Sequence, residues 1–240
     1  LGEIFMHDMR SLGVDVSLPP AKSGAATARS HILITPDGQR TMQTYLGACT
    51  ELAVADITAE TVGSPTITLL EGYVWDIAEG PALAAAAVAI ARKNGGKIAL
   101  SLSDSLCVER HQEEFARFVR DHTDIVFADE DEIMALLQVK DFAEVPPKVA
   151  AMPGLFVMTR SEKGSVLVKG EKHIEQEAIR VDKVVDSTGA GDAFTAGFLY
   201  AYCNDMKLRE CARAGTFCAT QVIQQVGARI GKDALSGLEA

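Results

Sequence analysis

From about residue 66 onward, short apolar runs alternate with amphipathic segments of helical length. The runs TITLLEG (66–72), KIALSLS (97–103) and DIVFA (124–128) are separated by EGPALAAAAVAIARKNGG and SLCVERHQEEFARFVRDH. Strands that are apolar along their whole length need cover on both faces, and helices between them supply that cover. The alternation therefore predicts βαβ units and an α/β fold, built on a parallel sheet with helices on both faces.

Later segments extend this pattern. LFVMT (155–159) predicts a further strand, and SVLVKGEKHIEQE (165–177) alternates around a Lys-Gly pair as a hairpin does. Two long helical stretches follow, AFTAGFLYAYCN and LRECARAGTFCATQVIQQVGA. Cys203, Cys211 and Cys218 have near-helical spacing in this pair, which predicts buried packing residues.

A separate β-rich piece precedes the α/β part. Residues 26–47 alternate polar and apolar side chains on both sides of Pro36-Asp37-Gly38. Such a pattern predicts two strands joined by a tight turn, with one face in water. We expect a single large domain that carries this small hairpin.

Composition excludes several function classes. Acidic residues outnumber basic ones by 33 to 23, giving a net charge of −10 with no basic stripe, which argues against nucleic acid as a partner. The longest apolar run, 81–91, is about half the length that a bilayer crossing requires. Five cysteines without a CxxC do not form a disulfide framework, and the histidines show no zinc-ligand spacing. We therefore expect a cytoplasmic protein that has no membrane-spanning segment and binds no zinc.

The segment VVDSTGAGDAF (184–194) carries the strongest chemical signal. It does not fit a dinucleotide fingerprint, which would need glycine where Phe194 stands. Gly96-Lys97 does not fit a Walker A loop, because Ile98 follows it. A different kind of glycine turn is therefore expected at this segment.

Glycines at 189 and 191 let a ligand approach the main chain, so the free amides of 189–192 could converge on an anion. A carboxylate beside that anion, at Asp192, suits a base that accepts a hydroxyl proton during phosphoryl transfer. The alternative is an ordinary strand-to-helix turn in which Asp192 complements the helix dipole. The spacing alone leaves both open.

The motif DSTGAGD, followed by AFTAGF, resembles the C-terminal signature of the PfkB/ribokinase family of carbohydrate and nucleoside kinases, usually D-T-x-G-A-G-D. Other segments resemble family motifs in the same order: TLLEGYVWD (68–76), ADEDEIMALL (128–137, N-x-x-E), TRSEKGSVLV (159–168, T-x-G-x-x-G) and QQVGAR (224–229). The resemblance implies a ribokinase-like fold: a mostly parallel sheet in three α/β/α layers, with residues 26–47 as part of a small β lid.

The resemblance also implies roles at the reaction centre. Asp192 is the expected general base and contacts the substrate, while Gly189, Ala190 and Gly191 form the anion hole. Glu71 matches a substrate-facing position at the carboxyl end of a predicted strand, where α/β sheets bind ligands. A strand-end acid is also a common turn residue, so this role has a structural alternative.

Further roles concern the nucleotide and ions. The resemblance implies that ATP contacts Asp129, Thr159, Gly164 and Gly227. It implies that Glu132 binds Mg²⁺ through water. It also implies that Asp186 and Thr188, with Gly227, bind a K⁺ ion, which some members of the family use. Hard cations such as Mg²⁺ prefer carboxylate and water oxygens. The structural alternatives are a first-turn helix acid for Glu132 and a strand end with its turn for Thr159 and Gly164.

Three departures from the family pattern stand out. The Asn of N-x-x-E is Asp129, which adds negative charge where a triphosphate is expected, and the first glycine of T-x-G-x-x-G is Ser161. The family's N-terminal segments, with a substrate-binding Asp and a Gly-Gly-Asn run, have no counterpart here. We therefore expect residues 1–240 to form a single ribokinase-like domain that lacks its N-terminal part.

The function implied is an ATP-dependent kinase that acts on a hydroxyl of a sugar or nucleoside. RTMQTYLGA and LLEGYVWD are most similar to the bacterial adenosine-kinase-like subgroup, although ribose and fructose kinases share the machinery. The alternatives are a catalytically weak nucleotide- or sugar-binding protein of the same fold and, from the glycine turn alone, a dehydrogenase. The expected partners are small molecules, and the expected state is a monomer or homodimer.

Overall fold

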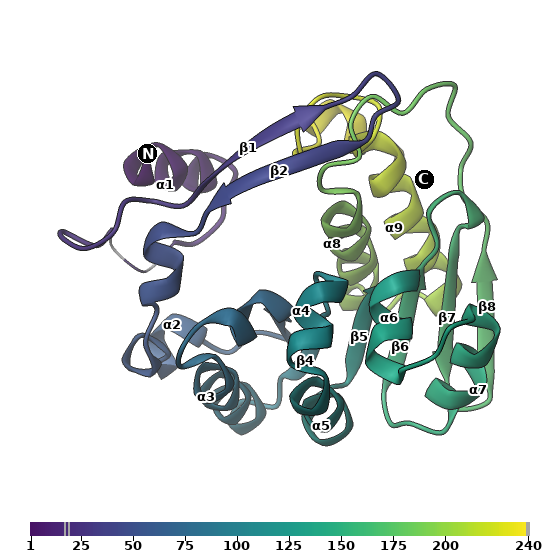
Figure 1. Ribbon diagram of the computed structural model, residues 1–240, viewed down its shortest axis with the longest axis horizontal. Helices are drawn as coiled ribbons and strands as arrows, with labels where there is room; N and C mark the ends of the chain where they lie inside the picture. The colour runs from purple at the N-terminus through teal and green to yellow at the C-terminus, as the bar shows by residue number, and fades with distance from the viewer. Residues whose placement is uncertain (17, 19, 239–240) are drawn as a thin grey trace.

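The computed structural model describes residues 1–16, 18 and 20–238. The described strands form two sheets (Figure 1): a hairpin of β1 (Arg29–Ile34) and β2 (Arg40–Tyr45), and a six-stranded sheet in the order β3-β4-β5-β6-β7-β8. In the large sheet β3 (Ile67–Glu71), β4 (Lys97–Ser101), β5 (Ile125–Asp129) and β6 (Leu155–Thr159) run parallel. β7 (Ser165–Lys169) is antiparallel to both of its neighbours, β6 and β8 (Lys172–Gln176). The predicted α/β fold with a mostly parallel sheet is confirmed.

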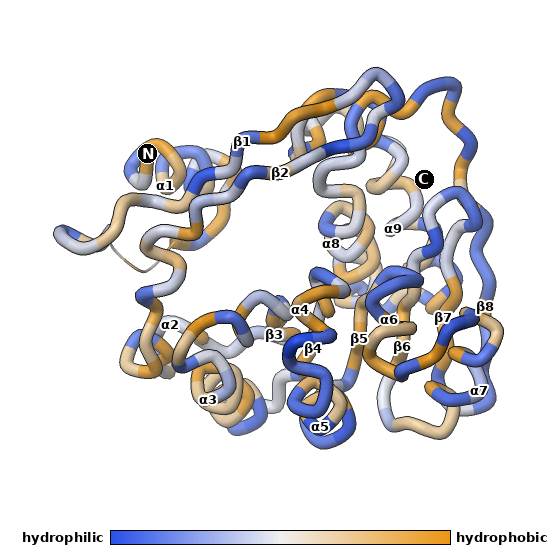
Figure 2. Tube along the Cα trace, viewed as in Figure 1, coloured by the Kyte–Doolittle hydropathy of each residue, from blue (hydrophilic) through white to orange (hydrophobic). Residues whose placement is uncertain are grey.

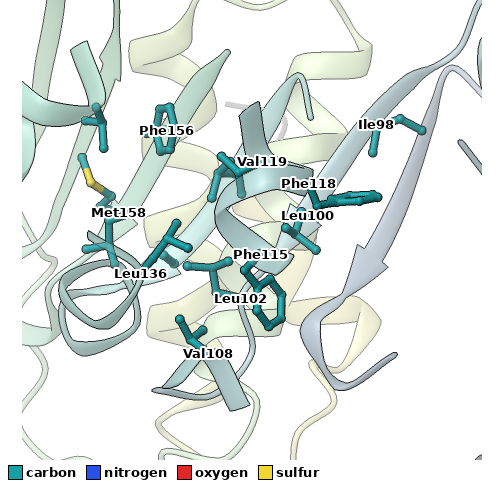
Figure 3. Close-up of a cluster of buried hydrophobic side chains, with 14 of the residues drawn as sticks. Ile98, Leu100, Leu102, Val108, Phe115, Phe118, Val119, Leu136, Phe156 and Met158 are labelled. Carbon is teal, nitrogen blue, oxygen red and sulfur yellow. The ribbon is translucent and has the colours of Figure 1, made fainter. Parts of the chain in front are cut away.

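Helices cover both faces of this sheet. One core holds side chains of α3 (Gly80–Lys93), α4 (Ser105–Arg110), α5 (Gln112–His122), α6 (Glu130–Leu137) and α7 (Val145–Ala150). Figure 3 shows part of it, with Phe115 and Leu102 close together. The second core joins the other face to α8 (Ala190–Cys203) and α9 (Leu208–Val222). The expected three layers are therefore present.

Alternation along the strands explains why they are apolar throughout. In β5, Val126 and Ala128 enter the first core, whereas Ile125 and Phe127 enter the second. Successive side chains of a strand point to opposite faces, so both series must be apolar when both faces are covered. The last residue of β5, Asp129, is also the N-cap of α6.

The hairpin β1–β2 is present, but the expectation that only one of its faces meets water is wrong. All strand residues of both strands are exposed, and Figure 2 shows the apolar stretch of β1 as an orange segment. The hairpin is anchored at its turn, where Gly38 is buried with φ 79° and an added Cβ would lie 2.9 Å from Val184 Cγ1. Two strands alone have no second layer to bury a face against.

The remaining helices are peripheral. α1 (Gly2–Ser11) precedes the hairpin, and the short α2 (Ala59–Val62) precedes β3. In the described parts of the chain, no helix combines the length and the apolar character that a bilayer crossing requires.

The cysteine prediction holds for two of its three residues. Cys211 and Cys218 are buried on α9, but Cys203 is exposed. Cys203 is the last residue of α8, where the chain turns towards solvent-exposed residues 204–207, so helical spacing did not bring it into the core.

Candidate active site

Three predicted site residues lie along one edge of the large sheet. Glu71, Asp129 and Thr159 are the last residues of the parallel strands β3, β5 and β6. Asp129 and Thr159 are paired directly in register. Open α/β sheets bind ligands beyond the carboxyl ends of their strands, so this edge is the expected place for a site.

Asp186 organises the glycine turn that leads into α8. Its Oδ1 accepts hydrogen bonds from the amide and hydroxyl of Thr188, at 2.9 and 2.6 Å, and its Oδ2 accepts one from the Gly227 amide at 2.9 Å. The residue is 1% exposed. The bond from the Thr188 hydroxyl is the main cause that lowers the pKa of Asp186, and the Gly227 bond adds to it. A buried carboxylate thus joins the glycine turn to the 224–229 loop, and its role towards K⁺ stays a prediction.

The two glycines of the turn differ in what the fold requires. Gly189, the N-cap of α8, has φ 77°, and a Cβ there would lie 2.7 Å from the Ala228 Cβ. Both the backbone angle and the close approach exclude other residues. At Gly191 an added Cβ would meet nothing within 4 Å. The fold therefore needs glycine at 189 but leaves free space in front of 191.

The amides of this turn are suited to an anion. Those of Gly191 and Asp192 are in the first turn of α8 and have no acceptor within the helix. The Ala190 amide has a long bond, 3.3 Å, to the Ser187 carbonyl. Free amides and the positive end of the helix dipole together favour an anion in front of Gly191.

Asp192, the predicted base, is exposed in the first turn of α8 and lies close to Glu71 electrostatically. The pKa of Glu71 is raised above its ordinary value, first by partial removal from water and then by the negative charge of Asp192. The charges of the two residues assigned to substrate therefore interact in the folded chain, although 121 positions separate them in the sequence.

Asp129 and Glu132 form a reciprocal capping box at the start of α6. The Glu132 amide donates to Asp129 Oδ1 at 2.8 Å, and the Asp129 amide donates to Glu132 Oε2 at 2.9 Å. Asp and Asn are equally good at this cap. The departure from Asn in N-x-x-E thus preserves the cap while adding a charge.

That added charge affects its neighbour. Burial, followed by the charge of Asp129, raises the pKa of Glu132 to about 8, and Asp104 contributes in the same direction. Such a gathering of acids fits a divalent cation, whose charge would offset their repulsion. In the described residues, nowhere do three or more His, Cys, Asp or Glu side chains assemble a metal cage by themselves.

The turn after β6 contains the predicted nucleotide residues Thr159 and Gly164. Gly164 is buried with φ 88°, and a Cβ there would collide with the Gln176 carbonyl oxygen. Ser161, where the family has glycine, adopts φ 50°. The family pattern thus marks a left-handed position, which serine occupies here at some cost in backbone energy.

Sequence reasoning missed Arg40 and Asp104. Arg40 begins β2, and its Nη1 donates to the Ser187 hydroxyl at 2.8 Å and to the Ser187 carbonyl at 3.3 Å. A guanidinium from the hairpin therefore lies against the glycine turn. The alternation of polar and apolar residues in β2 did not indicate this long-range contact. Asp104 could have been noticed, because it follows the predicted strand KIALSLS, and it caps α4 through the Cys107 amide at 2.9 Å.

Residues 1–235 match the pfkB family of carbohydrate kinases. The chain belongs to this family. Its six-stranded sheet flanked by helices is the ribokinase-like fold that the resemblance implied.

Two solved structures of this kind are very similar to the chain. A probable sugar kinase from Rhizobium etli and an adenosine kinase from Sinorhizobium meliloti each share 40% identity and a TM-score of 0.95. Each comparison covers 99% of this chain, but 72% and 73% of the respective relative.

Curated relatives are matched over shorter stretches. A nucleoside kinase from Methanocaldococcus jannaschii is 31% identical over 137 residues, which cover 57% of this chain. The chain spans less than half the length of such relatives: 45% of that nucleoside kinase and 42% of a cytidine kinase from Thermococcus kodakarensis.

Most of the predicted site residues fall into four sets, three of them along the edge of the sheet. Asp192 and Glu71 are electrostatic neighbours, Asp129 and Glu132 share one cap, and Thr159 is paired with Asp129. The fourth set, Asp186, Thr188 and Gly227, lies behind the glycine turn as its support. Their roles in binding and catalysis stay predictions.

Proposed function

We propose that the protein is an ATP-dependent kinase that transfers the γ-phosphoryl group to a hydroxyl of a sugar or nucleoside. The observation that carries this proposal is the first turn of α8, where free amides and an open space at Gly191 lie beside the carboxylate of Asp192. An anion cradle alone would not favour a carboxylate beside it, whereas phosphoryl transfer from ATP to a hydroxyl uses both.

In this reaction Asp192 acts as the general base. The acceptor oxygen forms a bond to the γ-phosphorus while the bond from that phosphorus to the β,γ-bridging oxygen breaks, and ADP leaves. The hydroxyl proton passes to the Asp192 carboxylate. The amides at 189–191 stabilise charge on the phosphoryl oxygens, with those nearest the open space contributing most.

The nucleotide side of the proposed site is the edge formed by Asp129, Thr159, Gly164 and Gly227. Mg²⁺, when bound, neutralises phosphate charge, and Glu132 would hold it through water. The repulsion among Glu132, Asp129 and Asp104 supports a cation there. We propose K⁺ at Asp186 and Thr188 only as an accessory ion, because that carboxylate already accepts three hydrogen bonds.

Adenosine or a related compound is the acceptor class that we favour. The support is the 40% identity to the Sinorhizobium meliloti protein named adenosine kinase. A fructoselysine 6-kinase of Escherichia coli is 28% identical over 233 residues, and this similarity supports a sugar as the alternative acceptor. Five free thiols support a reducing compartment, so we also propose a cytoplasmic location, with the protein as a monomer or homodimer.

A catalytically weak binding protein is the second candidate. It is favoured by the negative charge of Asp129, next to the acid Glu132, where the triphosphate is proposed to lie. The test is ADP release from Mg-ATP by the full-length protein with adenosine, other nucleosides, ribose and fructose. Turnover with one acceptor supports the kinase and names its substrate, whereas ATP binding without turnover on any acceptor supports the binding protein.

A further inference from the structure

A compact charged cluster joins two segments of the proposed nucleotide site. Arg160 faces Glu130 through two contacts, Nε to Oε2 at 3.0 Å and Nη2 to Oε1 at 3.2 Å, and Lys163 Nζ lies 3.3 Å from the same Oε2. The Arg160 guanidinium also stacks 3.9 Å from the ring centre of Phe142, which is 6% exposed. The hydrogen bonds from Arg160 are the main cause that lowers the pKa of Glu130.

Such a pair is better held than most surface ion pairs. The Arg160 and Glu130 side chains are 24% and 25% exposed, and the contact is two-pronged. Planar guanidinium groups fix a carboxylate in orientation as well as distance, and stacking on an aromatic ring restricts them further. Lysine cannot reproduce this geometry.

The cluster lies immediately beyond a register pair of the sheet. β5 and β6 end with Asp129 opposite Thr159, and the next residues are Glu130 and Arg160. Glu130 is the first residue of α6, the helix that carries Glu132. Arg160 is the first residue of the turn 160–164. The ion pair thus connects the acidic helix start to that turn.

The turn 160–164 needs external support. Two of its residues, Ser161 and Gly164, have left-handed backbone angles, φ 50° and 88°. Residues 161–163 are exposed, so their burial contributes little. The turn is closed by a backbone bond from the Arg160 amide to the Gly164 carbonyl at 2.8 Å. Its first residue is therefore the place from which a side chain can fix it.

We propose that Glu130 and Arg160 are positioning residues for the nucleotide: their ion pair holds the turn 160–164 at a set distance from the start of α6 and thereby determines ATP affinity. This rests on the proposed function, since it deepens the ATP side of the same site. The pair does not touch the reacting atoms. Its loss releases the turn without altering Asp192 or the glycine turn.

The test measures ATP affinity and turnover separately in the full-length protein. Glu130→Gln removes the charge and keeps the shape, and Arg160→Lys keeps the charge but loses the two-pronged contact and the stacking. A double variant, Glu130→Arg with Arg160→Glu, restores an ion pair in which the two charges have exchanged places. As a control, Asp121→Asn removes an exposed pair on α5, where Asp121 Oδ1 lies 3.0 Å from Arg120 Nε.

Calorimetry with a non-hydrolysable ATP analogue gives the Kd, and steady-state kinetics give the KM for each substrate and kcat. We expect Glu130→Gln to raise the Kd and the KM for ATP about tenfold, as for a lost charge-assisted hydrogen bond. Both kcat and the acceptor KM stay within about twofold, because the reaction centre is intact. Arg160→Lys gives a smaller rise, the exchange recovers part of the loss, and Asp121→Asn changes nothing.

Two results overturn the proposal and are distinguishable. If both single variants lower Tm but leave the Kd for the ATP analogue unchanged, the pair is only a stabilising contact and the inference is wrong. If the unmodified protein does not bind the analogue, the proposed function itself fails, and with it the role of the pair.

Discussion

Burial, and after it the negative charge of Asp192 in the first turn of α8, raises the pKa of Glu71 at the end of β3. The start of α8 and the end of β3 thus carry two acids whose charges repel one another. Structural stability alone gives no reason for that arrangement, because like charges in proximity are unfavourable. A hydroxyl compound that donates hydrogen bonds to both carboxylates would relieve it.

Replacing Glu71 by Gln tests this acceptor site. We expect the acceptor KM to rise about tenfold, the loss of one hydrogen bond to a charged group, with little change in ATP affinity. Lowering the pH protonates Glu71 and should weaken acceptor binding by the unmodified protein. Because the pKa of Glu71 is raised, this weakening should begin at a higher pH than it would for an ordinary glutamate. Acceptor KM measured across pH for both proteins checks this, and identical profiles would refute it.

The raised pKa of Glu132 predicts that the free energy of unfolding depends on pH. Its pKa is about 8 in the folded chain against 4.5 ordinarily, so between these values the folded state binds a proton that the unfolded state lacks. The contribution of this group to stability is therefore present below pH 4.5 and is lost as pH rises towards 8, by at most about 1.4 kcal/mol per pH unit. Gln can still accept the Asp129 amide bond, so Glu132→Gln should flatten the curve.

Urea unfolding of both proteins at a series of pH values measures that slope. Added Mg²⁺ should also reduce the loss in the unmodified protein at high pH, because a cation stabilises the ionised carboxylate. Parallel curves for Glu132→Gln and the unmodified protein would show that Glu132 is not the group responsible.

The two glycines of the anion turn should respond in opposite ways to alanine. Gly189→Ala places a side chain at φ 77° and against Ala228, so it should cost roughly 2 kcal/mol or more of stability. Gly191→Ala meets free space within a helix, so it should leave stability unchanged or raise it by up to about 1 kcal/mol.

Activity should follow a different order. If a phosphoryl group occupies the space before Gly191, its alanine variant should lower kcat by roughly 100-fold despite its unimpaired stability. Chemical denaturation and ADP release, measured on the same preparations, separate the two effects. A stable and fully active Gly191→Ala variant would remove the anion hole from this position.

Arg40 should contribute to turnover through its contact with Ser187. We expect Arg40→Met to lower kcat/KM by about tenfold, because the glycine turn loses a charged donor, with a Tm change no larger than that of other exposed substitutions. Arg29→Met, on the other strand of the same hairpin, serves as control, since Arg29 stacks on Tyr45 instead. Equal effects of the two variants would point to the hairpin in general.

Much of the fold followed from local patterns. The apolar runs 66–72, 97–103 and 124–128 are separated by segments of helical length, so a parallel sheet covered by helices on both faces could be predicted. The glycine turn with Asp192 was evident from its spacing. These features depend on residues adjacent in sequence.

What escaped prediction depends on contacts between distant segments. Arg40 and Ser187 are 147 residues apart, and no periodicity connects them. The exposure of both hairpin faces reflects the lack of a second layer, which alternation within β1 and β2 does not encode. The structural need for Gly189 comes from Ala228, a residue of a different loop.

The central claim is that Asp192 is the base of a phosphoryl transfer. The most direct test compares ADP release from Mg-ATP by the full-length protein, in the presence of adenosine and the other acceptors, with that of Asp192→Asn. Asp205→Asn, which removes the same charge just beyond the opposite end of α8, is the control. We predict a loss in kcat of about 100-fold or more for Asp192→Asn alone, with ATP binding retained. Turnover that is unaffected by Asp192→Asn would contradict the account.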